Sequence, residues 1–212
     1  MDLASTDRQP QGASLTDLSE QLITAYVGQR EATSGHRLEL SWDEMLRNLG
    51  CLVKLAGKPT PTHAGVMLFA HEPQRFLGQT EVACVRFKGI DVVSYIDRRD
   101  LRGPLYQLVD DAEQFIYRHM KIGRRIEGFA GVEYREYPAE AVREAIVNAV
   151  VHRDYSRHGQ RIRVFMFDDR IEVYSPGTLP PGVSLEKMRR LEPQSVQRNP
   201  IIVGVFLSLI HI

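Results

Sequence analysis

Apolar residues recur at helical spacing in three stretches of the chain and alternate with polar residues in others. The helical stretches are 15–27, 104–120 and 138–151. A short further helix should follow Ser41, where Ser41 and Glu44 form a capping box, and should end near Gly50. Alternation predicts strands at 81–87 and 132–137, and a hairpin made of 161–167 and 171–174. This mixture of elements predicts an α/β chain.

The organisation along the chain suggests two folded units. Residues 1–13 are polar with Pro and Gly, and we expect a flexible tail there. Residues 123–131 form a basic, glycine-bearing connection, so we place a boundary after residue 125. Residues 14–125 are then a mixed α/β module, and 126–206 form a second unit. Near its end, Asn199 is expected to cap a helix that has Pro200 at its first position.

Composition narrows the classes of function. Lys plus Arg and Asp plus Glu number 27 each, so the formal charge is zero and no global basic field indicates a nucleic-acid binder. Any DNA contact must be local or lie outside this chain. Two cysteines, Cys51 and Cys84, are too few for a disulfide framework, and reduced thiols favour a cytoplasmic protein. No segment reaches the roughly 18 apolar residues of a membrane span.

The helix expected at 138–151 carries the most informative pattern. Its apolar residues form a core-facing stripe made of Val142, Ala145, Ile146, Ala149 and Val150. Glu144, Asn148 and His152 advance by about 40° per step and form a polar row along the flank of that stripe. A carboxylate, an amide and an imidazole gain little from one another. The row is therefore either an ordinary polar flank or one side of a ligand site.

This row resembles the N-box, E-x-x-x-N-A, of histidine-kinase-like (GHKL) ATPases. In that family the Glu acts on the attacking water and the Asn oxygen ligates Mg²⁺ bound to the phosphates. The resemblance implies that Glu144 is the catalytic general base and that Asn148 is the metal ligand. It also implies ATP and Mg²⁺ as cofactors.

Longer runs resemble one bacterial and archaeal family in particular. E-A-I-V-N-A-V-V-H-R-D-Y, S-P-G-T-L-P and S-V-Q-R-N-P, with T-H-A-G-V-M-L-F upstream, are similar to the "RecG C-terminal-like" predicted transcriptional regulators and span roughly residues 40–206. The resemblance implies a two-layer α+β sandwich, an incomplete histidine-kinase-like ATPase fold at 126–206, and the family's connecting module before it. It implies DNA binding through domains absent from this chain, such as a Schlafen AlbA-like domain, and allows a homodimer. The chain has no P-loop sequence, so no helicase motor is expected.

The turn after the hairpin, Ser175 to Pro180, resembles the first glycine box. In the GHKL family an Asp there binds the adenine amino group, but Ser175 occupies that position here. Gly177 either allows close approach of a ligand or belongs to a structural Pro-Gly turn, and both interpretations stay open. His152 and Arg153 are further candidates for nucleotide contact. For Arg153, an ion pair with Asp154 or contacts at the helix end is the favoured interpretation.

The chain lacks the second glycine box of the family after R-N-P. Its last residues, L-S-L-I-H-I, are what the translation of a sequencing-library adapter gives, so we expect 207–212 to be a non-native tail. We therefore expect this chain to bind ATP weakly or not at all. Two hypotheses remain: part of an ATP-binding, DNA-binding transcriptional regulator, or a degenerate ATPase fold that serves as a non-catalytic scaffold for dimerisation or partner binding.

Overall fold

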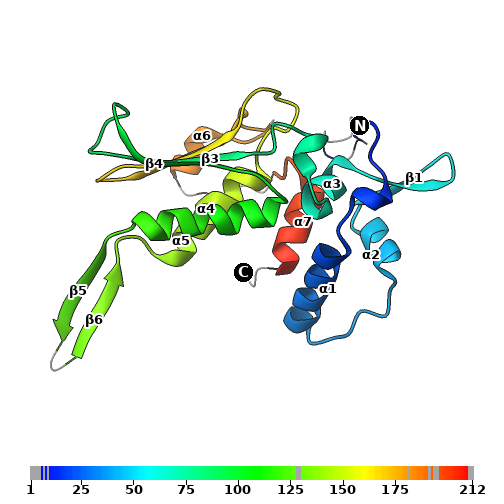
Figure 1. The fold of residues 1–212 in the computed structure, drawn as a ribbon, viewed down its shortest axis with the longest axis horizontal. Coiled ribbons are helices and arrows are strands. Elements are labelled where there is room, and N and C mark those ends of the chain that lie inside the picture. The colour runs from blue at the N-terminus through cyan, green and yellow to red at the C-terminus, as the bar shows by residue number, and fades with distance from the viewer. Residues whose placement is uncertain are drawn as a thin grey trace.

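The computed structural model describes residues 6, 8, 10–127, 130–180, 182–190, 192 and 196–209. Figure 1 shows an α+β chain in which a sheet with two long helices lies beside a mostly helical part that contains both chain ends. The predicted fold class is confirmed.

The main sheet is mixed. Its strands are β3 (Val82–Phe87), β4 (Tyr95–Leu101), β7 (Ile162–Met166) and β8 (Ile171–Tyr174), in the order β4-β3-β7-β8. The β3 and β7 strands run parallel, and the two outer pairs are antiparallel. Because β3 and β7 are neighbours, the sheet crosses the division that the sequence predicted after residue 125.

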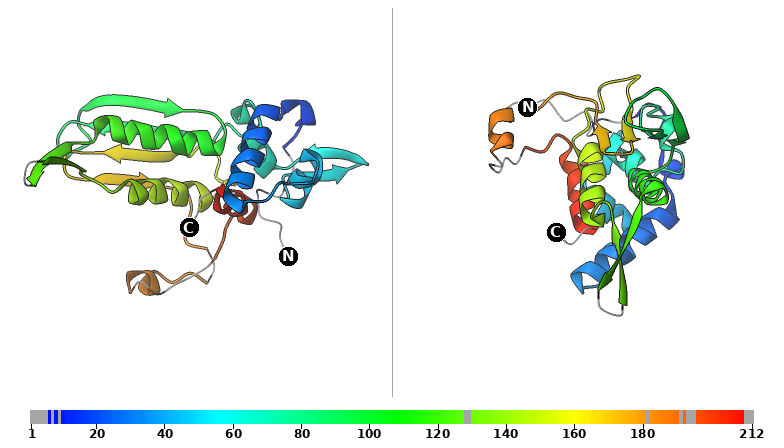
Figure 2. Two further views of the ribbon diagram at one scale, coloured as in Figure 1. Left: turned by 90° about the horizontal axis from the view of Figure 1, so that it is seen from below. Right: turned by 90° about the vertical axis from the view of Figure 1, so that its left-hand side faces the viewer.

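Two helices cover one face of this sheet. Helices α4 (Leu105–His119) and α5 (Ala139–Val151) lie side by side across it, as Figure 2 shows. The alternation along β7 turns Ile162, Val164 and Met166 into the core beneath these helices. The other face of the sheet carries a smaller apolar cluster, formed by Val85, Phe87 and Phe167 with Phe165 packed against it.

The remaining helical part is built from both ends of the chain. It contains the helices α1 (Glu20–Ser34), α2 (Trp42–Asn48), α3 (His63–Phe69) and α7 (Pro200–Leu209), the strands β1 (Leu52–Leu55) and β2 (Lys58–Pro61), and the 3₁₀ turns η2 (Leu15–Asp17) and η3 (Pro73–Arg75). Helix α7 packs against α1 and α3, and the Tyr26 and Ser208 hydroxyls are 2.8 Å apart. The C-terminal helix thereby joins the helical part to the end of the sheet unit.

Several expectations need correction. The helix expected at 15–27 is a 3₁₀ turn followed by α1, because the Ser19 side chain accepts from the Leu22 N–H and starts the helix there. The basic connection at 123–131 and the strand at 132–137 are instead one hairpin, β5 (Ile122–Glu127) with β6 (Ala130–Arg135). Charged β4 was not predicted. Ala145, expected in the core stripe of α5, is exposed, while Val147 and Val151 are buried.

The structure describes part of each of the two predicted tails. Within 1–13, Thr6 is buried and the Arg8 carbonyl accepts from the His63 N–H at 2.7 Å. Residues 207–209 continue α7, and 210–212 lie outside the described residues. Helix α6 (Leu185–Arg189) stands away from the sheet in Figure 2. Over the described part of the chain, the helices are too short or too polar to cross a bilayer.

Candidate functional site

Helix α5 presents the predicted polar row on its exposed flank. Glu144 and Asn148 are both exposed, and the Asn148 side-chain amide donates to the Glu144 carboxylate at 2.9 Å. One of the two amide N–H groups is engaged in this bond, and the amide oxygen is left available to a ligand. The structure thus brings these two predicted residues together, and the expectation that they gain little from one another is wrong for this pair.

His152 ends the same helix. Its backbone N–H donates to the Asn148 carbonyl at 3.0 Å, which places the imidazole at the C-terminal end of α5. Partial burial of the ring lowers the pKa of His152, and the positive charge of Arg198 lowers it further, while Glu144 acts in the opposite direction. His152 is therefore neutral at physiological pH and can accept a hydrogen bond.

Arg153 turns away from the row. Its side chain is fully buried, and its guanidinium donates to the backbone carbonyls of Arg157 and Gln160 and lies 4.8 Å from the centre of the Tyr155 ring. Burial lowers the pKa of Arg153. The predicted pairing with Asp154 is wrong: Asp154 lies 3.4 Å from Arg157 and 3.5 Å from Arg198. The Arg153 side chain thus holds the backbone of the 157–160 loop through hydrogen bonds.

The glycine turn is tied to α5 by Ser175. The Ser175 hydroxyl donates to the Ala149 carbonyl at 2.7 Å, which fixes the end of β8 on the helix. Gly177 has φ +141°, and a Cβ there would lie 3.1 Å from the Cβ of Asp154. The Asp154 N–H also donates to the Pro176 carbonyl at 2.8 Å. Close packing against Asp154 therefore requires the glycine, irrespective of any ligand.

Asn199 is the positioning residue that the sequence did not reveal. Helix α7 begins at Pro200 as expected, but the Asn199 side-chain amide reaches back and donates to the Val151 and Arg153 carbonyls at 2.9 and 2.8 Å. These carbonyls lie at the end of α5, where a helix leaves acceptors unpaired. Asn199 thus caps the helix that carries the polar row. Its position after Arg198 and before a proline gave no signal of this.

The row suits the phosphate end of a nucleotide better than the adenine end. An amide oxygen and a carboxylate are hard oxygen groups, which Mg²⁺ accepts alongside phosphate oxygens and water. Among the described residues there is no cluster of three or more His, Cys, Asp or Glu side chains that could hold a metal alone. At the other end, the Ser175 hydroxyl is already committed to Ala149 and does not replace an adenine-binding Asp.

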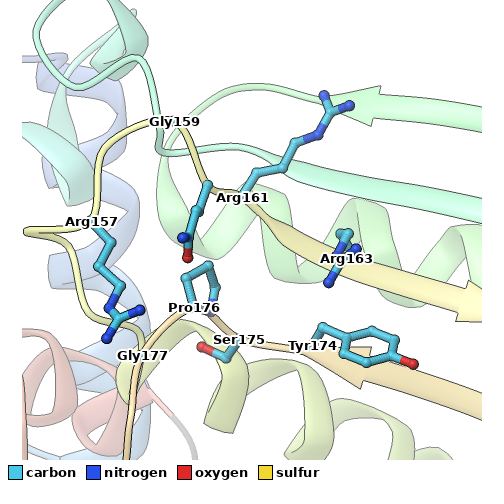
Figure 3. A pocket seen from close by; sticks show the side chains of 9 residues that line it. Arg157, Gly159, Arg161, Arg163, Tyr174, Ser175, Pro176 and Gly177 are labelled. Carbon is cyan, nitrogen blue, oxygen red and sulfur yellow. The ribbon is translucent and has the colours of Figure 1, made fainter.

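A cleft of about 510 Å³ lies beside the same turn, on the helix-free face of the sheet. Its lining residues, drawn in Figure 3, are Arg157, Gly159, Gln160, Arg161, Arg163 and 174–177. Glu144, Asn148 and His152 do not line it. The polar row of α5 and this cleft therefore share no lining residue.

Comparison with known proteins gives two findings. Residues 159–212 match the family described as "Putative ATP-dependent DNA helicase recG C-terminal". The crystal structure of the DIP2311 protein from Corynebacterium diphtheriae is similar, with a TM-score of 0.73 and 25% sequence identity, over 98% of this chain and 39% of that one. This chain thus spans well under half of that protein. No curated protein matches the sequence.

Proposed function

We propose that the flank of α5 binds ATP with Mg²⁺ in the full-length parent protein, since residues 159–212 match the RecG C-terminal-like family of ATPase-type domains. The observation that carries the proposal is the exposed, hydrogen-bonded pair of Glu144 and Asn148. A carboxylate and an amide at this spacing, on the helix that precedes the family's matching segment, supply the two groups that Mg²⁺-dependent phosphoryl chemistry needs.

Each residue of the row then has a separate task. The Asn148 amide oxygen would hold Mg²⁺, and the hydrogen bond to Glu144 fixes which end of the amide is presented. Glu144 accepts a proton from the attacking water as general base. Bound Mg²⁺ would neutralise charge on the phosphates. Neutral His152, one helical turn further on, offers a hydrogen-bond acceptor without adding negative charge beside them.

The wider role is part of the same proposal. We place the chain in a DNA-binding transcriptional regulator that contacts DNA through segments outside this chain and that forms a homodimer. Cys51 and Cys84 are both free and buried, and thiols that form no disulfide support a cytoplasmic location.

Ser175 favours a second candidate function. Because its hydroxyl bonds the helix, the residue that stands where the family's adenine-binding Asp would be has become structural. The fold would then serve as a scaffold for dimerisation or partner binding, without nucleotide turnover.

ATP hydrolysis distinguishes the two candidates. The rate of phosphate release is measured on the full-length parent protein, for the wild type, for Glu144→Gln and for the control Glu140→Gln, which removes an exposed carboxylate one turn earlier on α5. The proposal expects Mg²⁺-dependent hydrolysis that falls at least about 100-fold in Glu144→Gln and stays unchanged in the control. Absence of hydrolysis in the wild type, or an equal rate in Glu144→Gln, selects the scaffold.

A further inference from the structure

We propose that the cleft on the helix-free face of the sheet is a second binding site, which takes a phosphate-bearing ligand with a planar ring, of the size of a nucleoside monophosphate. We call it the arginine cleft and define it by Arg157, Gln160, Arg161, Arg163 and 174–177. Glu144, Asn148 and His152 of the polar row are not among its lining residues. Figure 3 shows Arg157 and Arg163 at its two ends, with Pro176 and Ser175 between them.

The charge around the cleft is positive. Three carboxylates near it are each shared by two arginines. The groups are Glu81 with Arg102 and Arg161, Asp100 with Arg98 and Arg161, and Asp154 with Arg157 and Arg198. Glu172 accepts a hydrogen bond from the Tyr174 hydroxyl and is paired with Arg170, which also pairs with Asp169. Arginines therefore outnumber carboxylates, and none of the described residues that line the cleft is acidic. Such a surface attracts an anion.

Arg163 is held by aromatic rings. Its guanidinium lies 4.8 Å from the centre of the Tyr174 ring and 5.5 Å from that of Phe165. Stacking keeps the planar fork oriented while leaving its N–H groups for an acceptor, which is the arrangement that suits phosphate. Tyr174 is 41% exposed, so its ring also offers a surface on which a planar group can stack.

A buried cation holds the backbone of the loop that lines the cleft. Arg153 is fully buried and holds the carbonyls of Arg157 and Gln160, two residues that line the cleft. Two of its guanidinium nitrogens, Nε and Nη1, have no hydrogen-bond partner in the described part of the chain. A charge buried with incomplete pairing is costly, and an anion bound just above it lowers that cost. The loop is thus held by the positive charge of Arg153, which takes no part in the polar row of α5.

Size and chemistry together define the ligand. A volume of about 510 Å³ falls within the usual range of small-molecule sites and accommodates a nucleotide. Arg157 and the loop around Gln160 can bind the phosphate, and Arg163 with Tyr174 can bind the ring. Arg161 points toward β4, where it lies 3.0 Å from Asp100, and borders the cleft. Because arginines supply the charge, this binding needs no Mg²⁺.

The test is equilibrium binding of AMP and of inorganic pyrophosphate, measured by calorimetry with EDTA present. We expect the wild type to bind AMP more tightly than pyrophosphate, and Arg163→Gln and Arg157→Gln each to weaken AMP binding about tenfold or more. The control Arg37→Gln removes one exposed arginine from the helical part and should leave the affinity unchanged. Circular dichroism verifies that each variant is folded.

The outcomes separate this site from the one on α5. Asn148→Ala should leave EDTA-resistant AMP binding intact, whatever it does to binding of ATP with Mg²⁺. Loss of AMP binding in Asn148→Ala, equal binding by Arg163→Gln and wild type, or no AMP binding at all would each overturn the arginine cleft. Equal affinities for pyrophosphate and AMP would overturn the role of the ring. A single-stranded oligonucleotide that binds while AMP does not would assign the face to nucleic acid instead.

Discussion

Asn199 should be a main determinant of how firmly α5 is held. The residue is 1% exposed, and its amide donates to two carbonyls at the end of α5. Asn199→Ala removes both bonds and leaves both carbonyls buried without that donor. At about 1 to 2 kcal/mol for each bond and its unpaired acceptor, the free energy of unfolding should fall by about 2 to 4 kcal/mol. For a chain of this length that lowers Tm by roughly 5 to 15 °C.

The assay is urea unfolding followed by circular dichroism. Asn199→Asp is the sharper variant, because it keeps the shape but turns carboxylate oxygens toward the two carbonyls, and it should destabilise at least as much as alanine. Asn48→Ala, at the exposed end of α2, is the matched control and should change the stability by less than about 0.5 kcal/mol. If Asn199→Asp were as stable as the wild type, the capping of α5 by Asn199 would be refuted.

Three further variants test other parts of the account. Gly65→Ala would place a Cβ 2.1 Å from the Cys51 carbonyl oxygen, so we expect the free energy of unfolding in urea to fall by more than about 3 kcal/mol. The control Gly28→Ala, which has open space on α1, should be neutral or stabilising. Ser175→Ala should lower the unfolding free energy by about 1 kcal/mol through loss of the bond to Ala149, and no change would show that the hydroxyl is free. The pKa of His152 is lowered in the folded state, so its contribution to stability is present above its unfolded pKa and is lost as the pH falls. Between about pH 7 and pH 5, the unfolding free energy of His152→Gln should therefore fall less than that of the wild type. An equal fall in both proteins would contradict this.

Features that depend on residues close together along the chain were predictable from the sequence. The Ser41 capping box starts α2, the Asp168-Asp169 turn closes the β7–β8 hairpin, and i, i+4 spacing brings Glu144 and Asn148 into contact. Each of these depends on residues that are neighbours along the chain. Periodicity and turn chemistry therefore suffice to find them.

The features that could not be predicted from the sequence depend on contacts between segments that are distant along the chain. Strand β4 has a charged pattern because its side chains are largely exposed, so alternation gave no signal. Gly177 is explained by packing on Asp154, and Asn199 by the end of α5; the partners lie 23 and 46 or more positions away. The arginine cleft also combines β7 with the turn after β8. None of these pairings follows from local pattern.

The most direct test of the central claim uses Mn²⁺ in place of Mg²⁺, because it detects weak binding by paramagnetic broadening of NMR signals. With ATP present, we predict that Mn²⁺ broadens the side-chain amide of Asn148 and the backbone signals of α5 around Glu144, and that Asn148→Ala abolishes the effect. Broadening that is absent, that does not require ATP, or that lies away from α5 would contradict a metal–nucleotide site on this helix.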